Sequence, residues 1–298
     1  MKFLFSALAA ASVVALAGCT TAPVESEAPS LSVEQTSALD AVLAAQPEDA
    51  QTRYDARNPA ETLAFFGIEP GMTVVEVLPG GGWYSKILIP YLGPEGQLIA
   101  AHYPDEIWPA LFGEDADPER INAVIARADG WAAGAREWYG EDGADIQQYK
   151  MTDGQAAENP SSVDAALFVR ALHNLHRSEA QLGLFTEAIA ETYDLVKPGG
   201  VVGVVQHSGP ETNSDEWADG NAGYLKQSRL IAAFEAAGFV LEATSDINAN
   251  PADVPSEDDF VWRLPPSTAT SEEGTPERAA FEAIGESNRM TLLFRKPA

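Results

Sequence analysis

The sequence predicts an α/β domain on a doubly wound sheet of about seven strands, mostly parallel, with an antiparallel strand at its C-terminal end. Short apolar runs rich in β-branched residues alternate along the chain with longer segments of helical periodicity. Turns that contain glycine and proline separate these segments. The 298 residues contain no internal repeat, so we expect one large domain.

The expected strands are short segments in which apolar and β-branched residues dominate. The segment MTVVEV at 72–77 has the continuous apolar character of a strand that is buried on both faces. The expected strands cover residues 72–77, 97–101, 145–149, 163–169, 201–206, 240–244 and 290–295.

The expected helices have apolar residues at helical spacing and recognisable ends. Ser32 is typical of an N-cap, and Pro59 of a first helical turn. The later helices end at Gly93, at the turn 197–200 and at Gly238. These signals predict helices over residues 32–46, 58–66, 83–92, 179–196 and 225–237.

The N-terminus resembles a bacterial lipoprotein signal. Lys2 precedes an apolar, alanine-rich stretch at 3–16, shorter than the roughly 20 residues that a membrane-spanning helix needs. The sequence Leu-Ala-Gly-Cys that ends at Cys19 resembles a lipobox, in which the cysteine is acylated. We therefore expect a lipid-anchored protein of the bacterial cell envelope that faces the periplasm or the exterior. An ordinary secretory signal is the alternative.

Composition excludes several classes of function. With 18 basic and 45 acidic residues the net charge is −27, and such a surface repels phosphate backbones, so nucleic acid is not an expected partner. Cys19 is the only cysteine, and its acylation would leave neither a disulfide nor a free thiol. Contact with a membrane is expected through the lipid anchor alone.

A cluster of glycines follows the first predicted strand of the domain. Gly80, Gly81 and Gly82 lie between the strand at 72–77 and the helix at 83–92. Ligands of doubly wound sheets bind at the carboxyl ends of the strands, and glycines let the backbone approach them without a clash from Cβ. The cluster is therefore a candidate binding loop, although a purely structural turn gives the same pattern.

The segment from Glu76 to Gly82 resembles motif I of the class I S-adenosylmethionine-dependent methyltransferases, an acidic residue before a Gly-x-Gly-x-Gly loop. Further runs are similar to a group of predicted bacterial methyltransferases, many of them exported, at 57–66, 80–84, 197–200, 236–239 and 293–297. The resemblance implies a Rossmann-like fold and S-adenosylmethionine as cofactor. It places Gly80 and Gly82 against the methionine part of the cofactor, with Gly81 in the same loop and Glu76 beneath it.

The resemblance also divides the chain. The expected parts are a signal peptide at 1–18, an acylated tether with the leading helix at 19–50, and a methyltransferase-like domain at 51–298 with insertions near 103–145 and 248–286.

Three positions after the predicted strands bear on cofactor binding. Leu78 stands where the family usually has the first glycine of the loop. His102 stands where the family usually has an acid that binds both ribose hydroxyls, and an imidazole makes one such hydrogen bond instead of two. Asp153 matches a position that often meets the adenine amine; a turn aspartate before Gly154 is the alternative.

All histidines of the chain follow predicted strands; they are His102, His173, His176 and His207. The segment RALHNLH corresponds to motif IV, where methyltransferases place polar groups that face the substrate. We therefore take His173, Asn174, His176 and His207 as candidate catalytic residues, because an imidazole can act as a general base near neutral pH. A metal site formed by His173, His176 and His207 is a further alternative.

The leading prediction is methyl transfer from S-adenosylmethionine to a small acceptor. Arg170 is a candidate for binding a carboxylate, either Glu76 or that of the cofactor. An apolar or aromatic acceptor would suit the tryptophans Trp83, Trp108, Trp131 and Trp138. One alternative is a binding protein that kept the fold and lost turnover, because S-adenosylmethionine is made in the cytoplasm. The other is a metal-dependent hydrolase that uses the histidines.

Overall fold

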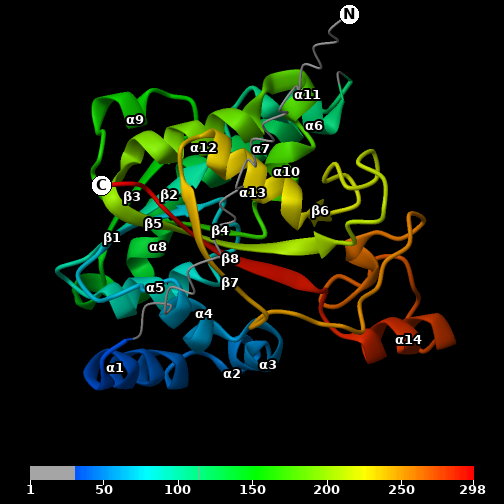
Figure 1. Cartoon of the computed structure of the whole chain (residues 1–298), viewed down its shortest axis with the longest axis horizontal. Coiled ribbons are helices and arrows are strands. Elements are labelled where there is room, and N and C mark those ends of the chain that lie inside the picture. The colour runs from blue at the N-terminus through cyan, green and yellow to red at the C-terminus, as the bar shows by residue number, and fades with distance from the viewer. Residues whose placement is uncertain (1–30, 114) are drawn as a thin grey trace, which may run out of the picture.

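The computed structural model describes residues 31–113 and 115–298, which form a mixed sheet with helices on both faces (Figure 1). The sheet has the order β3-β2-β1-β4-β5-β8-β7, and the short β6 pairs with β5. Its strands are β1 Thr73–Val77, β2 Gln97–His102, β3 Asp145–Lys150, β4 Val163–Val169, β5 Val196–Gly209, β6 Leu225–Lys226, β7 Val240–Ser245 and β8 Arg289–Arg295. Only β8 runs antiparallel to its neighbours, which confirms the predicted class.

Helices precede the sheet and connect its strands. Before β1 lie α1 Val33–Ala44, α2 Glu48–Gln51, α3 Tyr54–Arg57 and α4 Pro59–Phe65. From β1 to β3 lie α5 Ser85–Leu92, α6 Ile107–Phe112, α7 Pro118–Asp129, α8 Trp131–Tyr139 and the 3-10 turn η1 Gly140–Asp142. Later elements are α9 Gln155–Glu158, α10 Leu172–His176, α11 Glu179–Leu182, α12 Leu184–Leu195, α13 Gln227–Ala236, η2 Val261–Arg263 and α14 Pro276–Ile284.

Three expected boundaries were wrong. The helix predicted over 179–196 is broken into α11 and α12 by Gly183, whose left-handed backbone, φ +65°, ends the first of them. The helix predicted from 225 begins at 227, because 225–226 pair with β5 as β6. The turn at 197–200 lies inside β5 as a bulge. Val163 of β4 pairs with Val196, whereas Ala165 pairs with Val201, so residues 197–200 are left out of the register.

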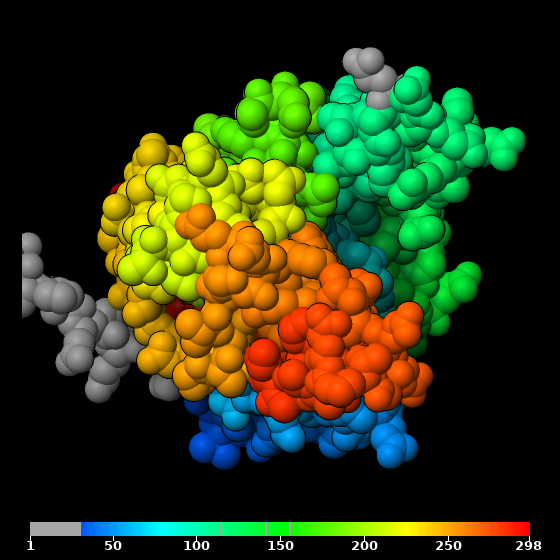
Figure 2. All heavy atoms as spheres, turned by 90° about the vertical axis from the view of Figure 1, so that its right-hand side faces the viewer, coloured from blue at the N-terminus to red at the C-terminus, as the bar shows by residue number. Residues whose placement is uncertain are grey.

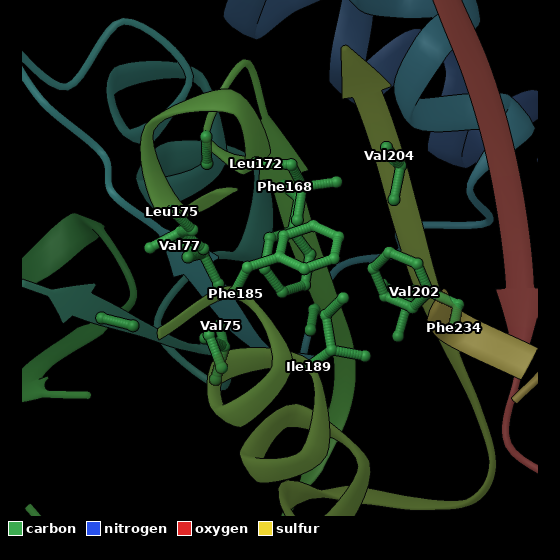
Figure 3. Close-up of a cluster of buried hydrophobic side chains, with 14 of the residues drawn as sticks. Val75, Val77, Phe168, Leu172, Leu175, Phe185, Ile189, Val202, Val204 and Phe234 are labelled. Atoms are coloured by element: carbon green, nitrogen blue, oxygen red, sulfur yellow. The ribbon is translucent and has the colours of Figure 1, made fainter. Parts of the chain in front are cut away.

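Alternating side chains of the strands build a separate core layer on each face of the sheet. Val75 and Val77 of β1 belong to a layer with Phe168 of β4 and with Phe185 and Ile189 of α12 (Figure 3). The opposite layer joins strand residues to α1, α4, α5 and α8; its strand members include Val74, Leu98, Ala165, Leu167 and Leu293. Glu76 shares the face of Val74, so the sheet places a carboxyl group in an otherwise apolar layer.

The chain order of the strands reverses between β1 and β4. A doubly wound sheet leaves a crevice at such a point, outside the carboxyl ends of its strands. Figure 2 looks onto this end of the sheet, which is hollowed between the turquoise-green segment that contains α6, α7 and α8 and the orange segment that follows β7. The predicted glycine loop and the segment RALHNLH leave β1 and β4 at this point.

The predicted signal peptide, the lipobox with Cys19 and the tether lie outside the described residues. Within 31–113 and 115–298, no helix is both long and apolar enough to cross a bilayer.

Candidate functional site

Two adjoining cavities lie at the carboxyl ends of the strands. Cavity 1 has a volume of about 570 Å³, and its walls include residues of α2 and α3, the glycine loop, the end of β4 and α10. Cavity 2 has a volume of about 430 Å³ between the glycine loop, the end of β2 and the helices α7 and α8. Both cavities share the wall residues Leu78, Gly80, Gly81 and Asn174.

The glycine loop is open toward both cavities. A Cβ placed on Gly81 would meet nothing within 4 Å, and one placed on Gly80 would meet only the carbonyl oxygen of Leu78, at 4.0 Å. Leu78 itself adopts a left-handed backbone, φ +55°, a conformation that glycine adopts more readily than leucine. The loop can therefore bring its backbone against a ligand.

Gly82 has a different surrounding from its two neighbours. Its Cβ would lie 2.5 Å from Cη2 of Trp138, and its φ is +75°. The residue lines neither cavity. Gly82 is therefore required for the packing of α8 against the loop, whereas Gly80 and Gly81 face the cavities.

Glu76 lies beneath the loop at the wall of cavity 1. It is 3 % exposed and accepts a hydrogen bond of 2.5 Å from Ser85 Oγ. Burial raises the pKa of Glu76 to about 7, against which the Ser85 hydrogen bond acts. The carboxyl group can therefore exist in either protonation state near neutral pH.

His102 forms part of the wall of cavity 2 with its ring against Trp131. The two ring centroids are 5.6 Å apart in an edge-to-face arrangement, and Trp131 Nε1 donates to the carbonyl oxygen of Gly80 at 3.2 Å. Burial and, to a smaller degree, Lys150 lower the pKa of His102 to about 4, so the imidazole is neutral. Its Nε2 atom is buried without a hydrogen-bond partner among the described residues.

The segment after β4 lines cavity 1 with Arg170 and His173, while Asn174 lines both cavities. Gln206 fixes the ring of His173: its Nε2 donates to Gly223 O at 3.1 Å and contacts His173 Nδ1 at 3.2 Å. Gln206 Oε1 lies 3.3 Å from the backbone nitrogen of His173, which donates to it. Gln206 Oε1 also lies 3.4 Å from His173 Nδ1, so Gln206 can bond the ring in either tautomer, with Nδ1 as acceptor or as donor.

The imidazole of His173 is neutral. Burial lowers its pKa to about 4, an effect that Gln206 partly offsets and Arg170 adds to. A neutral imidazole has one donor and one acceptor nitrogen, so it can orient a ligand by a hydrogen bond or accept a proton from it.

The structure does not bring the three candidate histidine ligands together. His207 lies near His173, with ring centroids 5.3 Å apart, and its Nδ1 is 2.6 Å from Ser287 Oγ. His176 uses both ring nitrogens elsewhere, 2.6 Å from Asp219 O and 3.2 Å from Arg229 Nη1. Among residues 31–113 and 115–298, no three histidine, cysteine or acidic side chains converge to hold a metal ion.

A cluster of arginines around one carboxylate borders cavity 1. Glu286 Oε1 lies 3.1 Å from Arg53 Nη1 and 3.2 Å from Arg57 Nε, and its Oε2 lies 3.2 Å from Arg289 Nη1. Burial opposes ionisation of Glu286, but Arg57 and Arg289 outweigh it and lower the pKa of the carboxyl group. Arg170 lies close enough for burial, Arg57 and Arg289 to lower its pKa to about 10, so it stays charged.

Sequence reasoning and the structure differ on which residues surround the cavities. Asp153 caps the turn after β3, 3.3 Å from the backbone nitrogen of Lys150, and lines neither cavity. Several further residues line cavity 1 that no sequence motif marks as functional: Arg53, Arg57, Tyr84 and Trp262. The spacing of Arg53 and Arg57, one helical turn apart, was the available signal.

No protein-family model matches the chain, and no curated protein matches its sequence. Among solved structures, the [4+2]-cyclase SpnF is similar with a TM-score of 0.51 and 18% identity, over 83% of this chain and 82% of that chain. A SAM-dependent methyltransferase from Aquifex aeolicus aligns with a TM-score of 0.46 and 13% identity, over 86% of this chain and 97% of that chain. The likeness to SpnF establishes the fold, so function must be argued from the site.

Proposed function

We propose that the protein transfers a methyl group from S-adenosylmethionine to a small acceptor. The observation that carries this proposal is the open glycine loop, where Gly80 and Gly81 form a wall common to both cavities at the reversal point of the sheet. A ligand as long as a nucleoside joined to an amino acid can extend past such a loop from one cavity into the other. The resemblance of 76–82 to motif I supports the same conclusion.

The residues present fit this cofactor. In cavity 2 the neutral His102 has an unused Nε2 atom for a ribose hydroxyl, and Trp131 and Trp108 offer aromatic surface. Buried polar atoms normally have partners, so this unpaired nitrogen is itself a sign of a missing ligand. In cavity 1 Glu76 and the loop would hold the amino-acid part. The cofactor would supply an electrophilic methyl group.

The acceptor would occupy cavity 1 next to Asn174, which lines both cavities. Asn174 and His173 both offer hydrogen-bonding groups there, and neither is charged. Their role would be to orient the acceptor, because transfer of an activated methyl group depends chiefly on alignment. Trp262 and Trp83 would exclude water from the acceptor.

A protein that binds the cofactor without turnover is the second candidate. The similar structure with a TM-score of 0.51 is named as a cyclase, so this fold also serves other reactions. Metal-dependent hydrolysis has less support, because His176 is committed to Asp219 and Arg229. Elemental analysis of protein purified without a histidine tag tests that alternative, and we expect no stoichiometric metal.

Calorimetric titration with S-adenosylmethionine and S-adenosylhomocysteine tests the proposal. We expect one site per chain and at least about tenfold weaker binding in Gly81→Val, because the new side chain would occupy the cofactor's path. Gly134→Val is the matched control, since Gly134 is an exposed residue of α8 outside both cavities. Formation of S-adenosylhomocysteine on addition of small-molecule extracts then separates a methyltransferase from a binding protein.

We further propose that the mature chain is anchored to the bacterial cell envelope through an acylated Cys19, with the domain outside the cytoplasm. Metabolic labelling with a tagged fatty acid tests the acylation. The apolar stretch at 3–16 and the following Leu-Ala-Gly-Cys support this proposal.

A further inference from the structure

Arg170 lines cavity 1 beside the arginines that bind Glu286. Its Nε atom is buried and has no hydrogen-bond partner among the described residues. Arg53, Arg57 and Arg289 share Glu286. A buried N–H group without a partner is costly, so an anionic ligand that pairs with this guanidinium would be favoured.

The local charge is opposite to that of the whole protein. The chain carries a net charge of −27, yet the basic side chains Arg53, Arg57, Lys86 and Arg170 line cavity 1 together with only two carboxyl groups, Asp49 and Glu76. Burial leaves Glu76 only partly ionised near pH 7. The cavity is therefore a positive site that would attract an anion despite the acidic surface.

Donors with suitable chemistry surround Arg170. Arg57 binds Glu286 through its Nε atom, and its guanidinium lies 4.7 Å from the ring centroid of Trp83. The neutral imidazole of His173 lies at the same wall and can donate one hydrogen bond. Two guanidinium forks and one imidazole N–H form the type of donor set that binds the oxygens of a carboxylate or phosphate group.

We propose that cavity 1 selects an anionic methyl acceptor and holds it by a carboxylate or phosphate group against Arg170 and Arg57. This inference rests on the proposed methyl transfer, because it assigns the acceptor's chemical class at the same site. One carboxylate on the cofactor would engage a single guanidinium fork, whereas the cavity offers two. The aromatic rings of Trp83, Tyr84 and Trp262 would contact the remainder of the acceptor.

Matched probes test the proposal in the presence of saturating S-adenosylhomocysteine, which fills any subsite for the cofactor's own carboxylate. The probes are benzoate, phenyl phosphate and the neutral benzamide. We expect at least one anion to bind tenfold or more tightly than benzamide, and the tighter anion identifies the acceptor's group. Equal binding of benzamide and both anions would overturn the proposal.

Arg170→Met should weaken binding of the preferred anion at least tenfold and leave the affinity for S-adenosylhomocysteine unchanged. Arg120→Met is the control, because Arg120 is an exposed residue of α7 outside both cavities. Arg170→Met should also melt no earlier than the wild type, since it removes a buried Nε–H group that has no partner among the described residues. A variant that binds S-adenosylhomocysteine more weakly, but 5′-methylthioadenosine equally well, would assign Arg170 to the cofactor's carboxylate and contradict the proposal.

The outcome is separable from that of the proposed function. If S-adenosylhomocysteine does not bind at all, methyl transfer fails, and the same titrations without it still decide whether Arg170 forms an anion site. Anion binding that survives unchanged in Arg170→Met would overturn the inference even if the cofactor binds.

Discussion

Leu78 and Arg170 have the same unusual backbone conformation at the ends of the two central strands. Leu78 follows β1 with φ +55° and donates its N–H to Ala101 O at 2.8 Å. Arg170 follows β4 with φ +56° and donates its N–H to Val205 O at 2.7 Å. Left-handed non-glycine residues are strained and tend to cluster at functional sites. Here both lie on the wall of cavity 1, where we expect the ligand.

The strain at Leu78 can be measured with two variants. Leu78→Gly and Leu78→Ala both remove the side chain, but only alanine keeps the unfavourable left-handed conformation. We expect Leu78→Gly to be more stable than Leu78→Ala by about 1 kcal/mol in urea unfolding. An alanine variant as stable as the glycine variant would show that the backbone relaxes at this position.

His102→Phe tests the role of cavity 2 in nucleoside binding. The variant keeps an aromatic ring against Trp131 but removes the buried, unpaired Nε2 atom. We expect about fivefold to tenfold weaker binding of S-adenosylhomocysteine, because one hydrogen bond to the ligand is lost, while stability is unchanged or higher. Adenosine is the control ligand and should lose the same factor. Unchanged affinity for both ligands would remove His102 from the nucleoside site.

The pH dependence of stability tests the environment of Glu76. Its pKa is about 7 in the folded protein and near the ordinary 4.5 in the unfolded chain. Below pH 4.5 the carboxyl group is protonated in both states. Between pH 4.5 and 7 the unfolded chain loses a proton that the folded protein keeps, so stability falls as the pH rises. Above pH 7 this contribution is constant.

Glu76→Gln has no such proton to lose and keeps an oxygen for Ser85 Oγ. The free energy of unfolding of the variant minus that of the wild type should therefore increase by about 3 kcal/mol from pH 4 to pH 8. Unfolding in urea at both pH values measures this difference. A difference that does not change with pH would mean that Glu76 is ionised as readily as a solvated carboxylate.

The lipid anchor is tested at Cys19. Cys19→Ala removes the only thiol of the chain, so the variant should incorporate no tagged fatty acid and should be released or remain unprocessed. Labelling in a bacterial host, compared with the wild type, measures the effect. Equal labelling of the two proteins would refute acylation at this residue.

The fold was predictable because its central strands are buried on both faces. Segments such as 73–77 are rich in apolar and β-branched residues, and the turns between elements carry glycine or proline. The break at Gly183 was missed, since a glycine within a helical pattern does not reveal its sign of φ. The start of α13 was missed because β6 forms only through pairing with the distant end of β5.

The candidate site was predictable only where a local motif encodes it. The glycines of the loop were found, but Gly82 serves to admit Trp138, a residue far away in the sequence. His176 lies only three residues after His173. Its ring nevertheless contacts the carbonyl oxygen of Asp219, because the fold brings a remote loop beside it. The pairing of Arg57 with Glu286 joins opposite ends of the domain, so no local pattern announces the arginine cluster.

A crystal structure of the protein with S-adenosylhomocysteine is the most direct test of the account. We predict one bound molecule that passes Gly80 and Gly81, with its adenosine part in cavity 2 beside His102 and its amino-acid part in cavity 1 above Glu76. Crystals grown with millimolar ligand in which both cavities stay empty, or in which the ligand binds elsewhere, would contradict it.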